Sequence, residues 1–177
     1  SMGIIVAAPT AGSCGALPGT CLAAGETMGW SDETMARGML AAGLIGIFVT
    51  VRSSFAAEVT GCQGETGVGA AMAAAALVDM HGGTLNQALA AASMALQNTL
   101  GLVCDPVANR VEVPCLGRNI SAAANALTSA NVALADFAEV IPLDEVIATH
   151  NTIGRSLPRE LRCTCLGGLS ITESAKK

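Results

Sequence analysis

The sequence predicts an all-α protein, a compact helical domain with close-packed helices rich in glycine and alanine and with cysteines on irregular loops. Apolar residues recur at three- and four-residue steps over several long segments. No series of segments has the alternating pattern of half-buried strands. The 177 residues contain no internal repeat. We therefore expect one domain over residues 1–177, with the residues after about 172 disordered.

The first expected element is a loop over residues 9–15, where small hydroxyl and glycine residues follow a proline. Such a loop lets backbone N–H groups approach a small anion closely. A plain turn between two buried elements explains the same residues equally well. A helical pattern follows Gly19 and runs to about Met28.

A second helix is expected to begin at Ser31, because its side chain can cap the helix and two acidic residues follow at the positive end of the dipole. We expect its larger apolar residues to face the core, and its small residues to let a neighbouring helix approach closely. The larger residues are Met35, Met39, Leu40, Leu44, Ile47 and Phe48, and the small ones are Gly38, Ala42, Gly43 and Gly46.

Four further helices complete the prediction. One runs from Cys62 to Met80 and ends at a glycine cap, and Thr84 with Gln87 forms a capping box that opens the next. The core face of that helix is expected to carry Leu85, Leu89, Ala92, Leu96 and Leu100. The last two span roughly Asn119–Phe137 and Leu143 to just before Pro158. Val107, Val111 and Val113 are expected in a short extended excursion.

The composition indicates a partly covered surface. Hydrophobic residues make up 51% and charged residues only 13%, well below the usual quarter. The longest apolar run, Ala41 to Val51, is shorter than the roughly 20 residues of a spanning helix, so we expect a protein partner or an oligomer and no membrane. A net charge of -5 and 2% aromatic residues exclude nucleic acid as the expected partner.

The cysteine and lysine counts bear on the chemistry. Seven cysteines, an odd number, fit a disulfide framework poorly, so we expect a cytoplasmic protein with metal or redox chemistry. The only lysines are Lys176 and Lys177, on the polar tail. Because pyridoxal phosphate needs a buried lysine for its Schiff base, we expect no pyridoxal phosphate on this chain.

Three cysteines lie on small, turn-forming sequence: Cys62, Cys104 and Cys115. Cys62 is placed where a helix is expected to begin, and free backbone N–H groups there favour the thiolate. The spacings match neither zinc fingers nor bacterial ferredoxins. From spacing alone, buried structural cysteines remain an even alternative, and a structural zinc site is a weaker one.

Several sequence motifs resemble, in the same order, the α chain of the iron–sulfur-dependent L-serine dehydratases, and the resemblance covers nearly the whole chain. These motifs are residues 8–15 (APTAGSCG), 61–67 (GCQGETG), 72–76 (MAAAA), 100–107 (LGLVCDPV), 111–115 (VEVPC), Arg118-Asn119 and 166–169 (LGGL).

The resemblance implies a helical catalytic domain, the C-terminal cluster-binding portion of an α chain, in which Cys62, Cys104 and Cys115 hold a [4Fe–4S] cluster. The open iron would act as a Lewis acid on the serine hydroxyl, and the products would be pyruvate and ammonia. A β chain or β domain would complete the enzyme, and the isolated segment is expected to be inactive or nearly so. A related lyase acting on cysteine or another β-substituted amino acid, or a non-catalytic helical interaction domain, are the alternatives.

The remaining site residues are expected from the same motifs. Thr10, Gly12 and Ser13 would bind the serine carboxylate, and Arg118 and Asn119 would orient the substrate or screen the charge of the cluster. The general base is unassigned: Glu65 and Glu112 lie near cysteines in the sequence, and His81 and His150 are the only histidines.

Four cysteines have no assigned role: Cys14, Cys21, Cys163 and Cys165. The sequence Arg162-Cys163-Thr164-Cys165 departs from the family pattern, which commonly reads Arg-Glu-Thr there. These two thiols could be alternative ligands, form a disulfide or be inert.

Overall fold

The computed structural model describes residues 3–177 and confirms the all-α class. Seven α-helices form between short 3-10 and π-helical turns: α1 (Thr20–Met28), α2 (Asp32–Arg52), α3 (Ala57–Thr60), α4 (Val68–Met80), α5 (Leu85–Gln97), α6 (Cys115–Leu134) and α7 (Leu143–Ser156). Within the described residues no strand forms, and the one β-bridge is an isolated pair, Cys104 with Arg162.

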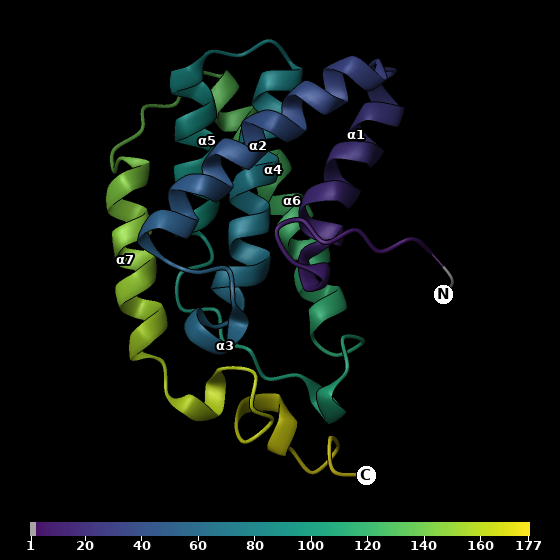
Figure 1. The fold of residues 1–177 in the computed structure, drawn as a ribbon, viewed down its shortest axis with the longest axis vertical. Helices are drawn as coiled ribbons and strands as arrows, with labels where there is room; N and C mark the ends of the chain where they lie inside the picture. Colours follow the sequence, from purple (N-terminus) through teal and green to yellow (C-terminus); the bar gives the residue numbers. More distant parts are fainter. Residues whose placement is uncertain (1–2) are drawn as a thin grey trace.

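Helix α4 is the centre of the fold, with α2, α5 and α6 packed around it (Figure 1). Every residue from Val68 to Val78 is buried. A helix that is apolar all round is expected at the middle of a core, because it has no face to give to water. Its alanine-rich sequence keeps the surrounding helices close to its axis.

The predicted helix starts are confirmed where a side chain caps the helix. The Ser31 Oγ accepts a hydrogen bond from the Thr34 N–H at 3.2 Å, and Thr84 and Gln87 form the expected capping box. The predicted end of the third helix is also confirmed, since Gly82 has φ 77° just after Met80.

The prediction for the core face of α2 is wrong for four of its large apolar residues. Leu40, Leu44, Ile47 and Phe48 are exposed, Leu40 by 73%. The buried face instead carries Gly38, Ala42, Ile45, Gly46 and Val49. The small residues face inward because a side chain at Gly38 or Gly46 would meet the methionines of α4.

Three smaller corrections concern α5, α6 and the loop between them. Leu85 is 72% exposed and Leu100 lies beyond the end of α5. Helix α6 begins at Cys115 and ends at Leu134, both earlier than expected. The valine-rich segment forms a 3-10 turn over Val107–Asn109 and exposed loop in place of an extended excursion. The segment closes on itself, since the Val107 N–H donates to the Val113 carbonyl at 2.9 Å and the Arg110 N–H to the Val107 carbonyl at 3.0 Å.

Helix α2 is long and apolar enough to cross a membrane by length and composition alone, which many core helices also are. One of its faces is packed along α4, and the Arg37–Asp79 ion pair (3.1 Å) also joins the two helices.

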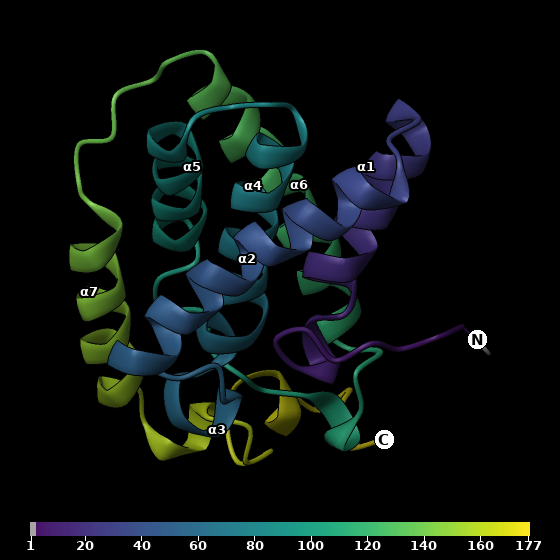
Figure 2. The same cartoon turned by 45° about the horizontal axis from the view of Figure 1, so that its top comes forward.

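The start of α6, the turn before α4 and the C-terminal segment gather at one end of the molecule, the lower end in Figures 1 and 2. This end contains the cysteines singled out above.

Candidate cysteine-centred site

Cys62 and Cys104 lie together in a small buried cluster separate from the main core. They pack with Ala57 and with the half-buried Leu102 and Cys163. Cys62 begins the π-helical turn Gln63–Gly67 that leads into α4. The preceding Gly61 has φ 74° and lies against the carbonyl of Leu102, a position that excludes any side chain.

Cys62 is the thiol whose ionised form its surroundings favour. A hydrogen bond from the Cys104 thiol is the main cause that lowers the pKa of Cys62 to about 6, with smaller contributions from the Thr66 hydroxyl and Arg118. Burial opposes this shift. The same hydrogen bond, together with burial, raises the pKa of Cys104. The hydrogen bond between the two thiols therefore favours the ionised form of Cys62 and the protonated form of Cys104.

Cys115 lies within electrostatic reach of this pair. It is the first residue of α6 and is buried. Burial raises the pKa of Cys115, and the negative charges of Cys62 and Glu65 add to the effect. The structure thus brings the three predicted ligands, from three separate segments, to one end of the molecule.

The C-terminal segment adds a fourth thiol. The Cys163 N–H donates to the Cys104 carbonyl and the Cys104 N–H to the Leu161 carbonyl, both at 2.8 Å. Cys163 also interacts with the Cys104 side chain. Cys165 instead donates to the Pro106 carbonyl at 3.4 Å, so of the two extra C-terminal thiols only Cys163 joins the cluster.

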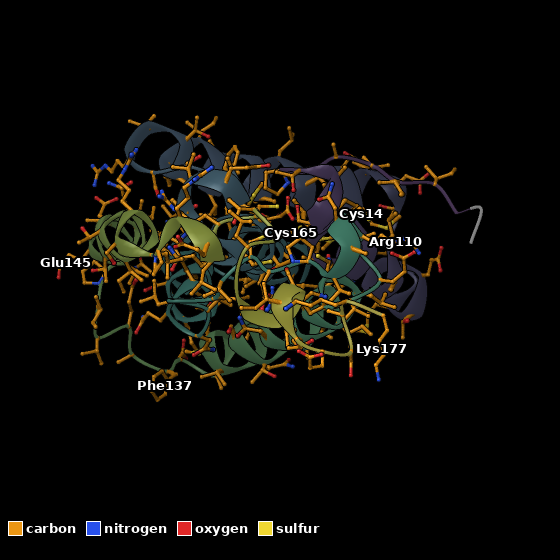
Figure 3. The ribbon with its side chains drawn as sticks, turned by 90° about the horizontal axis from the view of Figure 1, so that it is seen from below. Cys14, Arg110, Phe137, Glu145, Cys165 and Lys177 are labelled. Atoms are coloured by element: carbon orange, nitrogen blue, oxygen red, sulfur yellow. The ribbon has the colours of Figure 1, made fainter. Side chains whose placement is uncertain are left out.

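The other two cysteines lie outside this group. Cys21 is buried in the main core, where burial raises its pKa to about 12. Cys14 is half-buried on the loop before α1. In Figure 3, which views the molecule from below, Cys14 and Cys165 fall well inside the outline, whereas Phe137 and Glu145 lie at its edge.

Iron–sulfur clusters are held by cysteine thiolates, and Cys62, Cys104 and Cys115 supply buried thiols at this end of the molecule. Among residues 3–177, no group of three His, Cys, Asp or Glu side chains is arranged to hold one metal ion. The Arg118 guanidinium lies close enough to Cys62 to favour the ionised form of its thiol.

A buried ion pair connects this site to the C-terminal segment. Arg118 donates to the Asp105 carboxylate at 2.7 Å and to the Val103 carbonyl at 2.8 Å. The other Asp105 oxygen accepts from the Leu169 N–H at 2.8 Å, and the neighbouring Gly168 has φ 60°. Asp105 was not singled out from the sequence, although it directly follows Cys104 in a family motif.

The loop of residues 9–13 is held against the same site. The Ser13 side chain is buried and donates within the loop, to the carbonyls of Ala8 and Thr10. The Thr10 hydroxyl donates to the Glu65 carboxylate at 2.8 Å. Gly12 lies so close to that carboxylate that a Cβ there would collide with it.

Asn119 joins the loop to α6. Its amide donates to the carbonyls of Gly12 (2.8 Å) and Cys115 (3.0 Å), and its oxygen accepts from the Ala16 N–H at 2.9 Å. A cavity of about 280 Å³ borders Cys115, Gly12 and Asn119. The proximity of Thr10, Gly12, Ser13, Arg118 and Asn119 to the thiols agrees with a common site, and their contact with substrate stays a prediction.

The four candidate general bases lie in different parts of the structure. Glu112 is exposed on the loop before α6. His81 lies at the end of α4 remote from the thiols, with its ring against Trp30. His150 is buried on α7 and shares a 2.8 Å hydrogen bond with Ser53. Of these four residues, only Glu65 faces the loop and the thiols together.

Gln63 was missed from the sequence. Its amide donates to the His150 carbonyl at 2.7 Å, and its oxygen accepts from the Gly101 N–H at 2.8 Å. It therefore fixes the turn that carries Cys62 between α7 and the segment after α5. Its only sequence signal was its place in the Gly61–Gly67 motif.

The fold and site define a helical protein in which buried thiols from separate segments of the chain gather at one end of the bundle. The chain belongs to the serine dehydratase alpha chain family, which matches residues 1–170. It is 48% identical over its whole length to the L-serine dehydratase alpha chain of Peptoniphilus asaccharolyticus, covering 61% of that protein.

Two further relatives agree. A probable L-serine dehydratase alpha chain of Bacillus subtilis (strain 168) is 46% identical over the whole chain, which covers 59% of it. One from Latilactobacillus sakei is 48% identical over 172 residues, with 97% of this chain and 82% of the relative covered. The chain thus spans about three fifths of the length of the first two relatives.

Proposed function

We propose that this chain is the cluster-binding part of an L-serine dehydratase, which converts L-serine to pyruvate and ammonia. The observation that carries the proposal is that Cys62 and Cys104 pack in one buried cluster, with Cys115 close enough for the charge of Cys62 to act on it. Two relatives that are 46–48% identical over the whole chain are named as L-serine dehydratase alpha chains, which supports the same reaction.

Cys62, Cys104 and Cys115 would hold a [4Fe–4S] cluster. When bound, such a cluster supplies a Lewis acid that stabilises the hydroxide leaving the substrate. Arg118 contributes positive charge beside the thiolates, and Asp105 fixes its orientation. The donors of the loop around Thr10, Gly12 and Ser13 would bind the serine carboxylate, with Asn119 holding that loop in place. A general base would remove the α-proton as the hydroxide leaves, and the resulting enamine would become an imine, which water hydrolyses to pyruvate and ammonia.

The wider context is part of the proposal. We expect a β chain or β domain as partner, an oligomeric enzyme in the cytoplasm, and a role in amino-acid degradation and gluconeogenesis. No pyridoxal phosphate, nucleic acid or membrane is required. Exposed apolar side chains along α2, including Val51 (77% exposed), support a protein partner.

The test is iron and acid-labile sulfide per chain after anaerobic reconstitution, followed by a serine deamination assay on the complete protein. We expect about four of each in the wild type, and loss of both iron and activity in Cys62→Ser. Cys21→Ser is the matched control, because Cys21 is buried in the main core. Iron that is indifferent to Cys62 would contradict the proposal and favour the non-catalytic alternative. A substrate panel separates serine from cysteine and other β-substituted amino acids.

A further inference from the structure

Glu65 has a distinctive position beside the thiols. It lies in the π-helical turn Gln63–Gly67, between Cys62 and α4. It is the only residue from Gly61 to Ala70 that is not fully buried. Short π-helical segments occur frequently at functional sites. The turn therefore offers one partly accessible side chain from an otherwise buried segment, and that side chain is a carboxylate.

The Glu65 carboxylate is held by one hydrogen bond and can accept more. Oε2 accepts the hydrogen bond from Thr10, and this is the one hydrogen bond that the Glu65 side chain makes within residues 3–177. No Lys, Arg or His in that part of the chain forms an ion pair with it. An ionised carboxylate has about four acceptor positions. It can thus accept from a further charged donor without losing Thr10.

The surrounding charge favours a cation at this position. Glu65 raises the pKa of both Cys115 and Cys163, so its charge acts on the thiol centre directly. The guanidinium closest to the thiols, that of Arg118, is paired with Asp105 at 2.7 Å. Because that guanidinium is engaged by Asp105, it forms no ion pair with Glu65, whose carboxylate stays available to a cationic group.

We propose that Glu65 binds the α-ammonium group of the amino-acid substrate. This proposal rests on the proposed function, since it assigns one part of L-serine to one residue of the same site. A carboxylate held by Thr10 receives the ammonium, and the loop of residues 9–13 lies beside it for the substrate carboxylate. Glu65 then distinguishes amino acids from hydroxy acids of the same length. Its contribution is to binding and orientation.

Equilibrium titration with two unreactive probes tests the assignment on the complete, anaerobically reconstituted protein. L-Alanine has the ammonium and carboxylate of serine but no β-hydroxyl, and 3-hydroxypropionate has the carboxylate and β-hydroxyl but no ammonium. Glu65→Gln keeps an acceptor for Thr10 and removes the charge. We expect it to weaken L-alanine binding by about 10- to 100-fold and to change 3-hydroxypropionate binding by less than about threefold.

Glu112→Gln is the matched control, because Glu112 is an exposed carboxylate on the loop that precedes Cys115. It should leave both dissociation constants unchanged, and iron content should equal that of the wild type in both variants. Equal weakening of both probes by Glu65→Gln would indicate a structural role and overturn the inference. Unchanged L-alanine binding, or a wild type that binds no L-alanine, would overturn it as well. Serine deamination by the wild type, assayed separately, judges the proposed function independently.

Discussion

Glu65 and Gly12 show how single residues shape the site. The Glu65 carboxylate is 55 residues away from Thr10 in the sequence and within hydrogen-bonding distance of it in the fold. Gly12 makes this contact possible, because any side chain there would occupy the space of the carboxylate. The glycine in the loop motif is thus explained by close approach between two segments, in addition to turn geometry.

Gly12→Ala should displace the Glu65 carboxylate and lower kcat/KM for serine by about 10-fold or more, since small misplacements in a site reduce rates strongly. Iron content should stay at the wild-type value, because Gly12 is not among the thiol ligands. Steady-state kinetics on the complete protein measures the effect. Gly3→Ala is the control, since a Cβ at Gly3 meets nothing within 4 Å. Equal kinetics for the two variants would contradict this explanation of Gly12.

At the scale of elements, the capped helix starts were predictable, whereas the inward face of α2 was not. Ser31 and Thr84 bond to backbone groups three residues away, so short-range sequence is sufficient to find them. The inward face of α2 depends on α4, because its small residues allow an approach that its large residues would block. Hydrophobic periodicity favours the larger side chains and therefore selected the wrong face.

Two glycines of α2 provide a direct test of this packing. Gly38→Ala should destabilise the protein by about 1–3 kcal/mol, since the new Cβ would lie 2.6 Å from Met80 Cγ and 3.2 Å from the Ala76 carbonyl oxygen. Gly43→Ala should be neutral or stabilise by up to about 1 kcal/mol, because it faces open space and alanine favours the helix. Urea unfolding of both variants gives the comparison. A Gly38→Ala variant as stable as Gly43→Ala would contradict the close packing of α2 on α4.

At the scale of the whole molecule, the site is assembled from segments far apart in the sequence. Motif resemblance predicted Cys62, Cys104 and Cys115, but the approach of Cys163 to Cys104 depends on how the C-terminal segment crosses the end of the bundle. The Thr10–Glu65 and Gln63–His150 contacts likewise depend on tertiary structure. No local pattern encodes such pairs, so the candidate cysteines could be predicted from motifs but their surroundings could not.

His150 couples this assembly to pH. It lies on α7 with its side chain fully buried, and its carbonyl accepts from Gln63, the neighbour of Cys62. Burial lowers the pKa of His150 below its ordinary value of 6.5. The folded protein therefore binds fewer protons at this residue than the unfolded chain does. The free energy of unfolding should then be constant well above pH 6.5 and fall as the pH decreases below it, by at most about 1.4 kcal/mol per pH unit.

Urea unfolding at several pH values between 7.5 and 5.5 measures this dependence, with His150→Gln separating it from the titration of carboxyl groups. Glutamine keeps a polar partner for Ser53 and has no proton to gain, so the variant should be less stable at pH 7.5 but should lose less stability on acidification. His81→Gln is the control: the His81 ring bonds to the Leu77 carbonyl at the half-exposed end of α4, and its replacement should keep the wild-type slope. A wild-type slope in His150→Gln would show that other groups govern the response to acid. A reduced slope would place the acid sensitivity of the fold at the contact between α7 and the turn that carries Cys62.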